Sequence, residues 1–564
     1  MVFVMSRLKY WIISGVVLAI AAALLLGPGR TSYRHLKERR DMNQAQASFA
    51  SGDYGKSTLS ARQALLLNPT NTEACRIMAE IADLSQLPTT LDWRRRLAEI
   101  TPSAENKLRL AEAGLRYQSR PFPLTEQILQ ELSTTTTTNL ALFHMVAAEH
   151  AIASRRLNEA ESHLAAAVRL APTNRLYQLN LAMVELSSTN STALAEARER
   201  LNAFAADANH APTALRALIA DGLAHNDPAT AQRYSEQLLR IPQATLPDRL
   251  QHLAIIKKTQ IADFPGQLGE LQHFAATNAT MVAQMSIWMQ ANGLVTNAVQ
   301  WLSGLPKPLR NQPRVQLATA TAIDAESDWP ALRELCVHGK WDDLDFLRLA
   351  FLSHAWNQLG ETTVARSNWH SAVNAAGGRF GALASLLDLT ARWNLTDERL
   401  DLFWLMFQKF PRERWVSMAL QQYYFNTGNT AGLRRIFQQM AAAFPDSTEA
   451  KNDLAYTSLL LRTNVLEAST TAAKLHENKP EDPTIASTYA FALHLRGRDT
   501  DGLAVMQKLA RTALEQPALA LHYGILLAAT GDKPGAQHYL TIARRSPGLL
   551  PEEKLLCTPA DGSH

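Results

Sequence analysis

The C-terminal third of the chain alternates regularly between helix-forming segments and turn residues. In residues 517–548, PALALHYGILLAATGDKPGAQHYLTIARRSPG, alanines and large apolar side chains recur every three or four positions, Gly531-Asp532 interrupts them, and the spacing then resumes. This period is that of an amphipathic helix, and Gly-Asp is typical of a tight turn. The pattern predicts two helices joined by a short turn.

The same pattern recurs upstream at a nearly constant spacing. Gly497 lies 34 residues before Gly531, and Gly428 lies 69 residues, about two repeats, before Gly497. The frame also fits residues 141–174 and 346–376, whereas between about 200 and 345 the period stays helical but the spacing is irregular. Such self-similarity predicts stacked helical hairpins after residue 41, with no β-sheet.

Each unit resembles the tetratricopeptide repeat (TPR) family, which has a small residue midway along the first helix, Gly at the turn, Ala in the second helix and Pro at the end. Those places hold Gly524, Gly531, Ala536 and Ala543, and Pro547 ends the unit one position early. The resemblance implies an all-α fold, an α-solenoid of TPR and TPR-like helical hairpins. It also implies protein binding rather than enzymatic activity, with no cofactor.

The stretch ASGDYGKS, residues 50–57, fits a relaxed phosphate-loop pattern in which Lys56 would reach phosphates and Ser57 would hold Mg²⁺. A phosphate loop follows a buried strand, but the residues before this stretch are rich in Ala and Gln and favour a helix. Gly52-Asp53-Tyr54 therefore reads as the turn of a hairpin. We expect no nucleotide binding.

The N-terminus carries twenty residues without a charge, from Tyr10 to Gly29. A helix of that length spans the ~30 Å hydrocarbon core of a bilayer, which predicts a single transmembrane helix in the bacterial cytoplasmic membrane. A cleaved signal peptide ending near Pro28 is the alternative. Five Lys or Arg follow the span and two precede it, which favours a cytoplasmic body, but many bacterial anchors face the other way and the orientation stays open.

Composition argues against several other functions. Outside residues 1–40 the chain has 49 Lys or Arg and 51 Asp or Glu, so it lacks the positive excess that nucleic-acid binding needs. The three cysteines lie far apart and form no metal or disulfide pattern. His144 and His150 are six residues apart and do not share a helix face, so the histidines are expected on helix surfaces without a metal. STTTTTN, residues 133–139, is expected to be a loop between repeats, and Trp93, Trp356 and Trp369 are expected in the core.

The TPR resemblance implies that the first helix of each hairpin lines a groove for partners. Grooves that bind a C-terminal carboxylate use Lys, Arg and Asn, of which only Asn452 is found here. The aromatic and apolar character instead suits an extended or helical peptide, unless several of these residues pack against adjacent repeats. The candidate groove residues are Trp415, Met418, Gln422, Phe425, Asn452, Tyr456, Ser487, Phe491, His494, Leu521 and Ile525.

The sequence thus predicts a membrane-anchored scaffold for protein–protein interactions, or more narrowly an assembly or export factor for envelope polysaccharide or protein. An enzyme with an unrecognised site is the remaining alternative. The predicted organisation is a tail (1–9), a transmembrane helix (10–29), a basic juxtamembrane segment (30–40), TPR-like repeats (41–200), degenerate repeats (201–345), C-terminal TPR repeats (346–550) and a tail (551–564).

Overall fold

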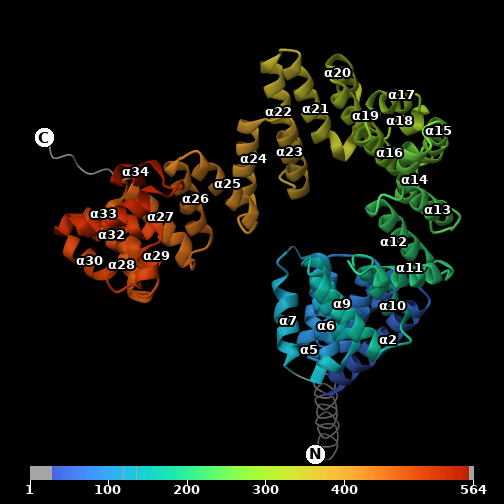
Figure 1. Cartoon of the computed structure of the whole chain (residues 1–564), viewed down its shortest axis with the longest axis horizontal. Coiled ribbons are helices and arrows are strands. Elements are labelled where there is room, and N and C mark those ends of the chain that lie inside the picture. Colours follow the sequence, from blue (N-terminus) through green and yellow to red (C-terminus); the bar gives the residue numbers. More distant parts are fainter. Residues whose placement is uncertain (1–27, 119, 135, 558–564) are drawn as a thin grey trace, which may run out of the picture. The chain divides into compact units, whose positions relative to one another are not determined.

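The computed structural model describes residues 28–118, 120–134 and 136–557, and within these ranges every regular element is a helix (Figure 1). The predicted all-α fold, without a sheet after residue 41, is therefore confirmed for the described residues. The chain divides into two compact units, Met1–Leu271 and Gln272–His564.

The first unit contains thirteen α-helices and one 3₁₀-helix among its described residues, and a further helix crosses its boundary. They are α2 (Pro28–Ala50), α3 (Tyr54–Leu67), α4 (Thr72–Leu84), α5 (Thr90–Ile100), α6 (Ala104–Tyr117), α7 (Pro123–Ser133), η1 (Thr136–Asn139), α8 (Ala141–Ala153), α9 (Leu157–Leu170), α10 (Arg175–Glu185), α11 (Ser191–Ala205), α12 (Ala211–Ala224), α13 (Pro228–Leu239), α14 (Leu246–Thr259) and the boundary helix α15 (Phe264–Ala275).

The second unit continues the series of helices to the end of the described chain. They are α16 (Ala279–Ala291), α17 (Val295–Ser303), α18 (Lys307–Arg310), α19 (Pro313–Glu326), α20 (Trp329–His338), η2 (Asp342–Leu344), α21 (Asp345–Gln358), α22 (Thr362–Ala375), α23 (Phe380–Arg392), α24 (Thr396–Lys409), α25 (Arg414–Asn426), α26 (Thr430–Ala443), α27 (Thr448–Leu460), α28 (Val465–Asn478), α29 (Pro483–Leu495), α30 (Asp499–Met506), α31 (Arg511–Leu514), α32 (Pro517–Thr530), α33 (Lys533–Arg544) and α34 (Pro551–Cys557).

Two local features recur at turns inside the hairpins, although the second, a side-chain cap, is present before α33 and α26 but absent before α22 and α24. One residue adopts a left-handed backbone, as Gly531 does with φ 97° between α32 and α33. The next side chain caps the second helix: the Asp532 carboxylate accepts a hydrogen bond from the Gly535 N–H at 3.0 Å. Glycine adopts this backbone without strain, and an Asp cap satisfies a free N–H of the helix. The Gly-Asp signal therefore encodes both the turn and the start of the second helix.

Residues 50–57 form such a turn, between α2 and α3. Gly52 has φ 79°, and the Lys56 N–H donates to Asp53 Oδ1 at 3.1 Å. Lys56 Nζ lies 2.9 Å from Asp53 Oδ2. Ser57 is buried, and its hydroxyl donates to the Ala45 carbonyl on the preceding helix at 2.8 Å. The hairpin interpretation of this stretch is confirmed, and the element before it is a helix.

Small residues mark the points where paired helices pass closely. A Cβ added to Gly524 would lie 2.8 Å from Leu540 Cγ and 3.1 Å from the Leu540 backbone nitrogen, so α33 leaves no room for a side chain there. This confirms the predicted close approach. Ser353 on α21 is also a small residue at such a contact, and its hydroxyl donates a hydrogen bond to the Ala365 carbonyl on α22 at 2.7 Å.

Several expectations need correction. Residues 30–40, predicted as a separate basic segment, belong to α2, and the predicted tail begins with α34. The predicted boundary at residue 200 falls inside α11. Trp369 is buried, while Trp93 and Trp356 are partly buried against core clusters. Within the run predicted as a loop, Ser133 ends α7 and Thr136–Asn139 form η1, while residue 135 lies outside the described residues.

The predicted transmembrane segment lies outside the described residues, apart from Pro28 and Gly29 at the start of α2. Across the part of the chain that the structure describes, no helix combines the length and the apolar character needed to span a bilayer.

Candidate functional site

Four of the predicted groove residues lie together on α25 and face outward. The Met418 side chain is 63% exposed, and Phe425 and Trp415 are each 43% exposed. Gln422 is also exposed. Trp415 contacts Phe380 edge-on, with ring centroids 6.3 Å apart. This part of α25 presents apolar side chains to the surface, as the sequence predicted.

Four other predicted groove residues are buried, so their assignment to an open groove was wrong. They are Asn452, Ser487, Phe491 and Leu521. Phe491 stacks on His522 of the neighbouring hairpin, with ring centroids 4.7 Å apart, and the Ser487 hydroxyl lies 2.7 Å from His522 Nδ1. Burial lowers the pKa of His522 to about 3, so the ring is neutral near pH 7. These side chains join adjacent hairpins.

The last three predicted residues, Tyr456, His494 and Ile525, are half-buried. His494 Nδ1 lies 2.6 Å from Asp499 Oδ1 on α30. Tyr456 donates a hydrogen bond to Glu553 of α34, and Ile525 packs against a cluster that contains Leu549 and Cys557. The end of the chain therefore covers part of the predicted groove.

A cavity of about 670 Å³ stays open beside this covered region, and we call it the α25 cavity. It brings together four predicted residues, Met418, Gln422, Phe425 and Tyr456, with residues of the chain end such as Leu550.

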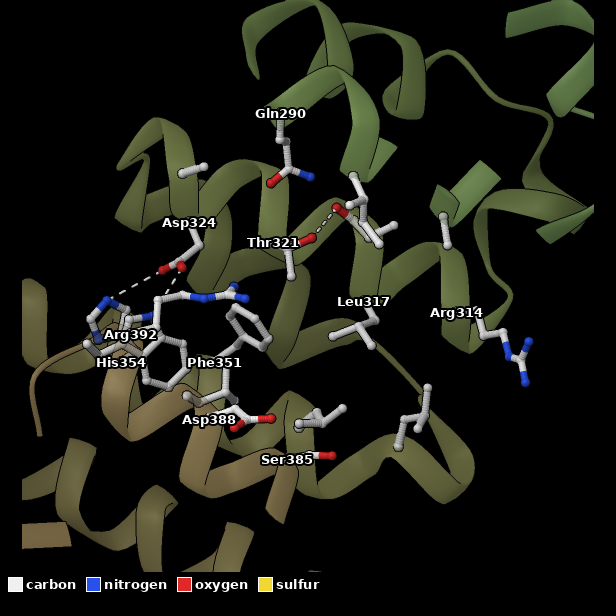
Figure 2. Close-up of a pocket in the computed structure, with 18 of the residues that line it drawn as sticks. Gln290, Arg314, Leu317, Thr321, Asp324, Phe351, His354, Ser385, Asp388 and Arg392 are labelled. Atoms are coloured by element: carbon white, nitrogen blue, oxygen red, sulfur yellow. Dashed lines mark hydrogen bonds and ion pairs between the residues drawn. The ribbon is translucent and has the colours of Figure 1, made fainter. Parts of the chain in front are cut away.

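A larger cavity, of about 880 Å³, lies in the second unit where no site residue was predicted (Figure 2). Its walls come from the first helices of four successive hairpins, α16, α19, α21 and α23, and we call it the α16–α23 cavity. Such a surface is where the TPR resemblance places partner binding, here in helices on both sides of the boundary between the predicted degenerate repeats (201–345) and the C-terminal repeats (346–550).

The lining of the α16–α23 cavity combines an apolar floor with polar groups around it. Leu317 and Leu344 supply partly exposed apolar surface, and the buried Leu347 and Phe351 lie beneath it. Figure 2 shows Gln290 and Thr321 on one side of Phe351, and Asp388 and Ser385 on the other. The lining includes Arg314 and Arg392 among its charged groups, and the Ile287 side chain is 62% exposed at its edge. Apolar surface with a few placed polar groups is typical of a binding site.

One wall of this cavity is a polar cluster of buried His354 with the partly buried Asp324 and Trp393. The Trp393 indole N–H donates to Asp324 Oδ2 at 3.1 Å, and His354 Nε2 lies 3.4 Å from Asp324 Oδ1 (Figure 2). The His354 ring stacks on Trp393 at 4.2 Å and meets Trp329 edge-on at 5.3 Å.

This packing fixes the electrostatics of that wall. Burial lowers the pKa of His354 to about 4, so the ring is neutral at pH 7. Burial also raises the pKa of Asp324, an effect opposed by the Trp393 hydrogen bond and the Arg392 charge. The cluster joins α19, α21 and the end of α23, and it holds the wall in one arrangement.

The histidines differ from the expectation of scattered surface positions. His144 Nδ1 lies 2.9 Å from His163 Nδ1 across the α8–α9 pair. Within the described ranges no group of three or more His, Cys, Asp or Glu is arranged to hold a metal ion. Four histidines are buried, which corrects the surface assignment for them: His150, His252, His354 and His522.

Comparisons with known proteins do not assign a family. No family model and no curated protein matches the chain. Among solved structures, the APC/C hetero-tetramer Cut9-Hcn1 covers 93% of this chain and 98% of its own at 11% identity, with a TM-score of 0.25. The structure of Naa15/Naa10 bound to HypK-THB covers 90% and 75% at 13% identity, with a TM-score of 0.27. TM-scores this low carry no conclusion, so the architecture rests on the chain's own helical hairpins.

Proposed function

We propose that this chain is a non-enzymatic scaffold that binds protein partners, and that the α16–α23 cavity receives a segment of a partner. The observation that supports this most is that four successive first helices contribute to one continuous cavity of about 880 Å³. A partner segment that inserted apolar side chains against the partly exposed Leu317 and Leu344 would remove apolar surface from water, which is the main source of affinity at such sites.

The polar groups around the cavity define what else the segment needs. Gln290 and Thr321 offer hydrogen bonds, and Asp388 and Arg392 offer opposite charges one helical turn apart on α23. An extended or helical peptide exposes backbone or polar groups on both sides of an apolar side chain, and these groups would form hydrogen bonds or ion pairs with the polar residues around the cavity. The proposed partner segment is therefore apolar at its centre and polar at its ends.

The membrane anchor belongs to the proposal and rests on the sequence alone. The uncharged run from Tyr10 to Gly29 and the basic residues that follow it support anchoring in the bacterial cytoplasmic membrane. The scaffold would then gather partners at that membrane. This setting suits the narrower role in assembly or export of envelope components.

The experiment compares two serine-to-tryptophan substitutions in the full-length chain purified from the membranes of its source cells. Ser385→Trp fills the α16–α23 cavity, whereas Ser371→Trp places the same ring on the exposed face of α22. The two serines are matched, since each donates a hydrogen bond to the carbonyl four residues earlier, at 3.0 Å. We expect a partner that co-purifies in stoichiometric amount to be lost from Ser385→Trp and kept by Ser371→Trp. Retention by both variants, loss from both, or no such partner with the unsubstituted chain would contradict the proposal.

A further inference from the structure

The last described part of the chain folds back onto helices that lie far earlier in the sequence. After α33 ends at Arg544, residues 546–557, which we call the C-terminal segment, reach α25, α26 and α27 (Figure 1). Thr430 at the start of α26 donates to the Glu552 carboxylate, 122 residues later, and Tyr456 on α27 donates to Glu553, 97 residues later. The segment therefore bridges several hairpins instead of only ending the last one.

The segment is held in the way that a groove holds a peptide. Leu549 and Leu550 are both buried, and Leu549 shares a cluster with Leu521 of α32. A Cβ added to Gly548 would lie 3.3 Å from Phe425 Cζ, and one added to Gly428 would lie 3.1 Å from Pro551 Cγ. Two leucine anchors followed by two hydrogen-bonded glutamates form a recognisable pattern, Leu-Leu-Pro-Glu-Glu.

Two features show that the fit is incomplete. Glu553 is buried, and among the described residues no Lys, Arg or His forms an ion pair with it. Burial raises the pKa of Glu553, although hydrogen bonds from Tyr456 and from the Leu550 N–H act in the opposite direction. A buried carboxylate without a cation weakens the packing of the segment that carries it. The α25 cavity also stays open beside the segment, with Met418 and Phe425 exposed.

We propose that the C-terminal segment is a displaceable internal ligand, and that the surface beneath it on α25, α27 and α32 binds a partner segment of the same chemistry, adjacent leucines followed by glutamates. The segment in place defines this chemistry, and the α25 cavity gives a longer partner additional apolar contact. Because the internal segment is tethered, it competes at a high effective concentration, so the partner binds only where it makes contacts that the internal segment lacks. This second surface does not depend on the α16–α23 cavity.

The test uses the full-length chain and its own cysteine. Cys557 is buried at the end of α34, and its backbone carbonyl accepts a hydrogen bond from Arg544 at 2.9 Å. Its alkylation rate therefore reports release of the segment, while buried Cys75 and Cys336 report unfolding elsewhere. Leu549→Asp places a charge at a buried anchor just before α34, and Leu555→Asp on α34 is the control, where the leucine is 74% exposed. We expect Leu549→Asp to raise the alkylation rate of Cys557 at least about tenfold, the effect of 1.4 kcal/mol or more, and Leu555→Asp to leave it within about twofold.

The second readout is binding of a labelled peptide, SPGLLPEEKLLS, followed by fluorescence anisotropy. We expect saturable binding to the Leu549→Asp chain, much weaker binding to the unsubstituted chain, and none for a control peptide in which both glutamates are lysine. If Cys557 stays protected in Leu549→Asp, the segment is a fixed part of the fold and the proposal fails. If Cys557 becomes reactive but the peptide does not bind, or binds as well as its lysine control, the vacated surface is not a binding site and the proposal also fails.

Discussion

Replacing Phe491 by alanine tests the packing between the last hairpins more sharply than any other single change. The side chain is 2% exposed, contacts both Tyr456 and His522, and stacks on the latter. A buried Phe→Ala change costs ~3–5 kcal/mol, because it removes apolar burial and leaves a cavity. Phe425→Ala is the matched control: this ring is 43% exposed, and truncating it removes only part of the contact with Gly548. We expect Phe425→Ala to cost less than ~1 kcal/mol.

Hydrogen exchange read by mass spectrometry resolves the effect along the chain. In stacked hairpins each repeat contacts mainly its neighbours, so the loss of stability should be concentrated in α27, α29 and α32. At ~3–5 kcal/mol, exchange in these helices should accelerate by roughly 10²–10⁴-fold, whereas residues 28–271 should keep their protection. Protection of α29 that is unchanged in Phe491→Ala, or an equal loss in Phe425→Ala, would refute the assignment of one ring to the core and the other to the surface.

Three further outcomes are expected. Gly524→Leu should destabilise α32 and α33 by ~1–3 kcal/mol through overpacking against Leu540, and uniform loss of protection along the whole chain would contradict this. Lys56→Ala should leave the unfolding midpoint unchanged, because the side chain pairs with Asp53 at an exposed turn. Neither this variant nor the unsubstituted chain should bind ATP or GTP in a filter-binding assay. Micromolar nucleotide affinity of the unsubstituted chain that is lost in the variant would overturn the turn assignment. Burial acts to raise the pKa of Asp248, but hydrogen bonds from Arg216 and Thr245 outweigh it and lower the pKa to about 2 from 3.8. A depressed carboxyl pKa stabilises the fold above pH ~4, and this contribution is lost as the pH falls towards ~2. We expect the contribution to the free energy of unfolding to be ~1–2 kcal/mol, because Arg216 is partly exposed. Asp248→Asn should abolish this part of the acid transition in urea titrations at pH 2–5.

The sequence predicted the hairpins well because each is encoded locally. The left-handed Gly531 and the Asp532 cap lie next to each other in the chain, and the close approach at Gly524 follows from the helical period. Where a turn lacks glycine, another residue adopts the left-handed backbone, as Ser327 does with φ 62°, and the sequence signal weakens. Among the hairpins that form the α16–α23 cavity, this weakens the signal at the α19–α20 turn, whereas Gly293 and Gly360 mark the α16–α17 and α21–α22 turns.

Four of the candidate groove residues are buried, for a reason that local patterns do not contain. Met418, Ser487 and Leu521 each lie ten residues before a turn glycine, so the repeat frame treats them as equivalent. Met418 is open, Ser487 contacts His522 of the next hairpin, and Leu521 lies under the C-terminal segment. What covers a position depends on contacts between residues far apart in sequence, and the frame of a single repeat does not specify them. The polar cluster of Asp324, His354 and Trp393 was missed for the same reason, since its members lie on three different helices or their ends.

The most direct test of partner binding at the α16–α23 cavity is site-specific photo-crosslinking in intact cells. A benzophenone amino acid at Ile287, at the cavity's edge, is compared with the same group at Val364, an exposed apolar position on α22. The cross-linked peptides are identified by mass spectrometry. The scaffold proposal predicts one discrete segment of one partner, apolar at its centre, that cross-links from Ile287 but not from Val364 and is lost when Ser385→Trp fills the cavity. The same products from both positions, or none from Ile287, would contradict it.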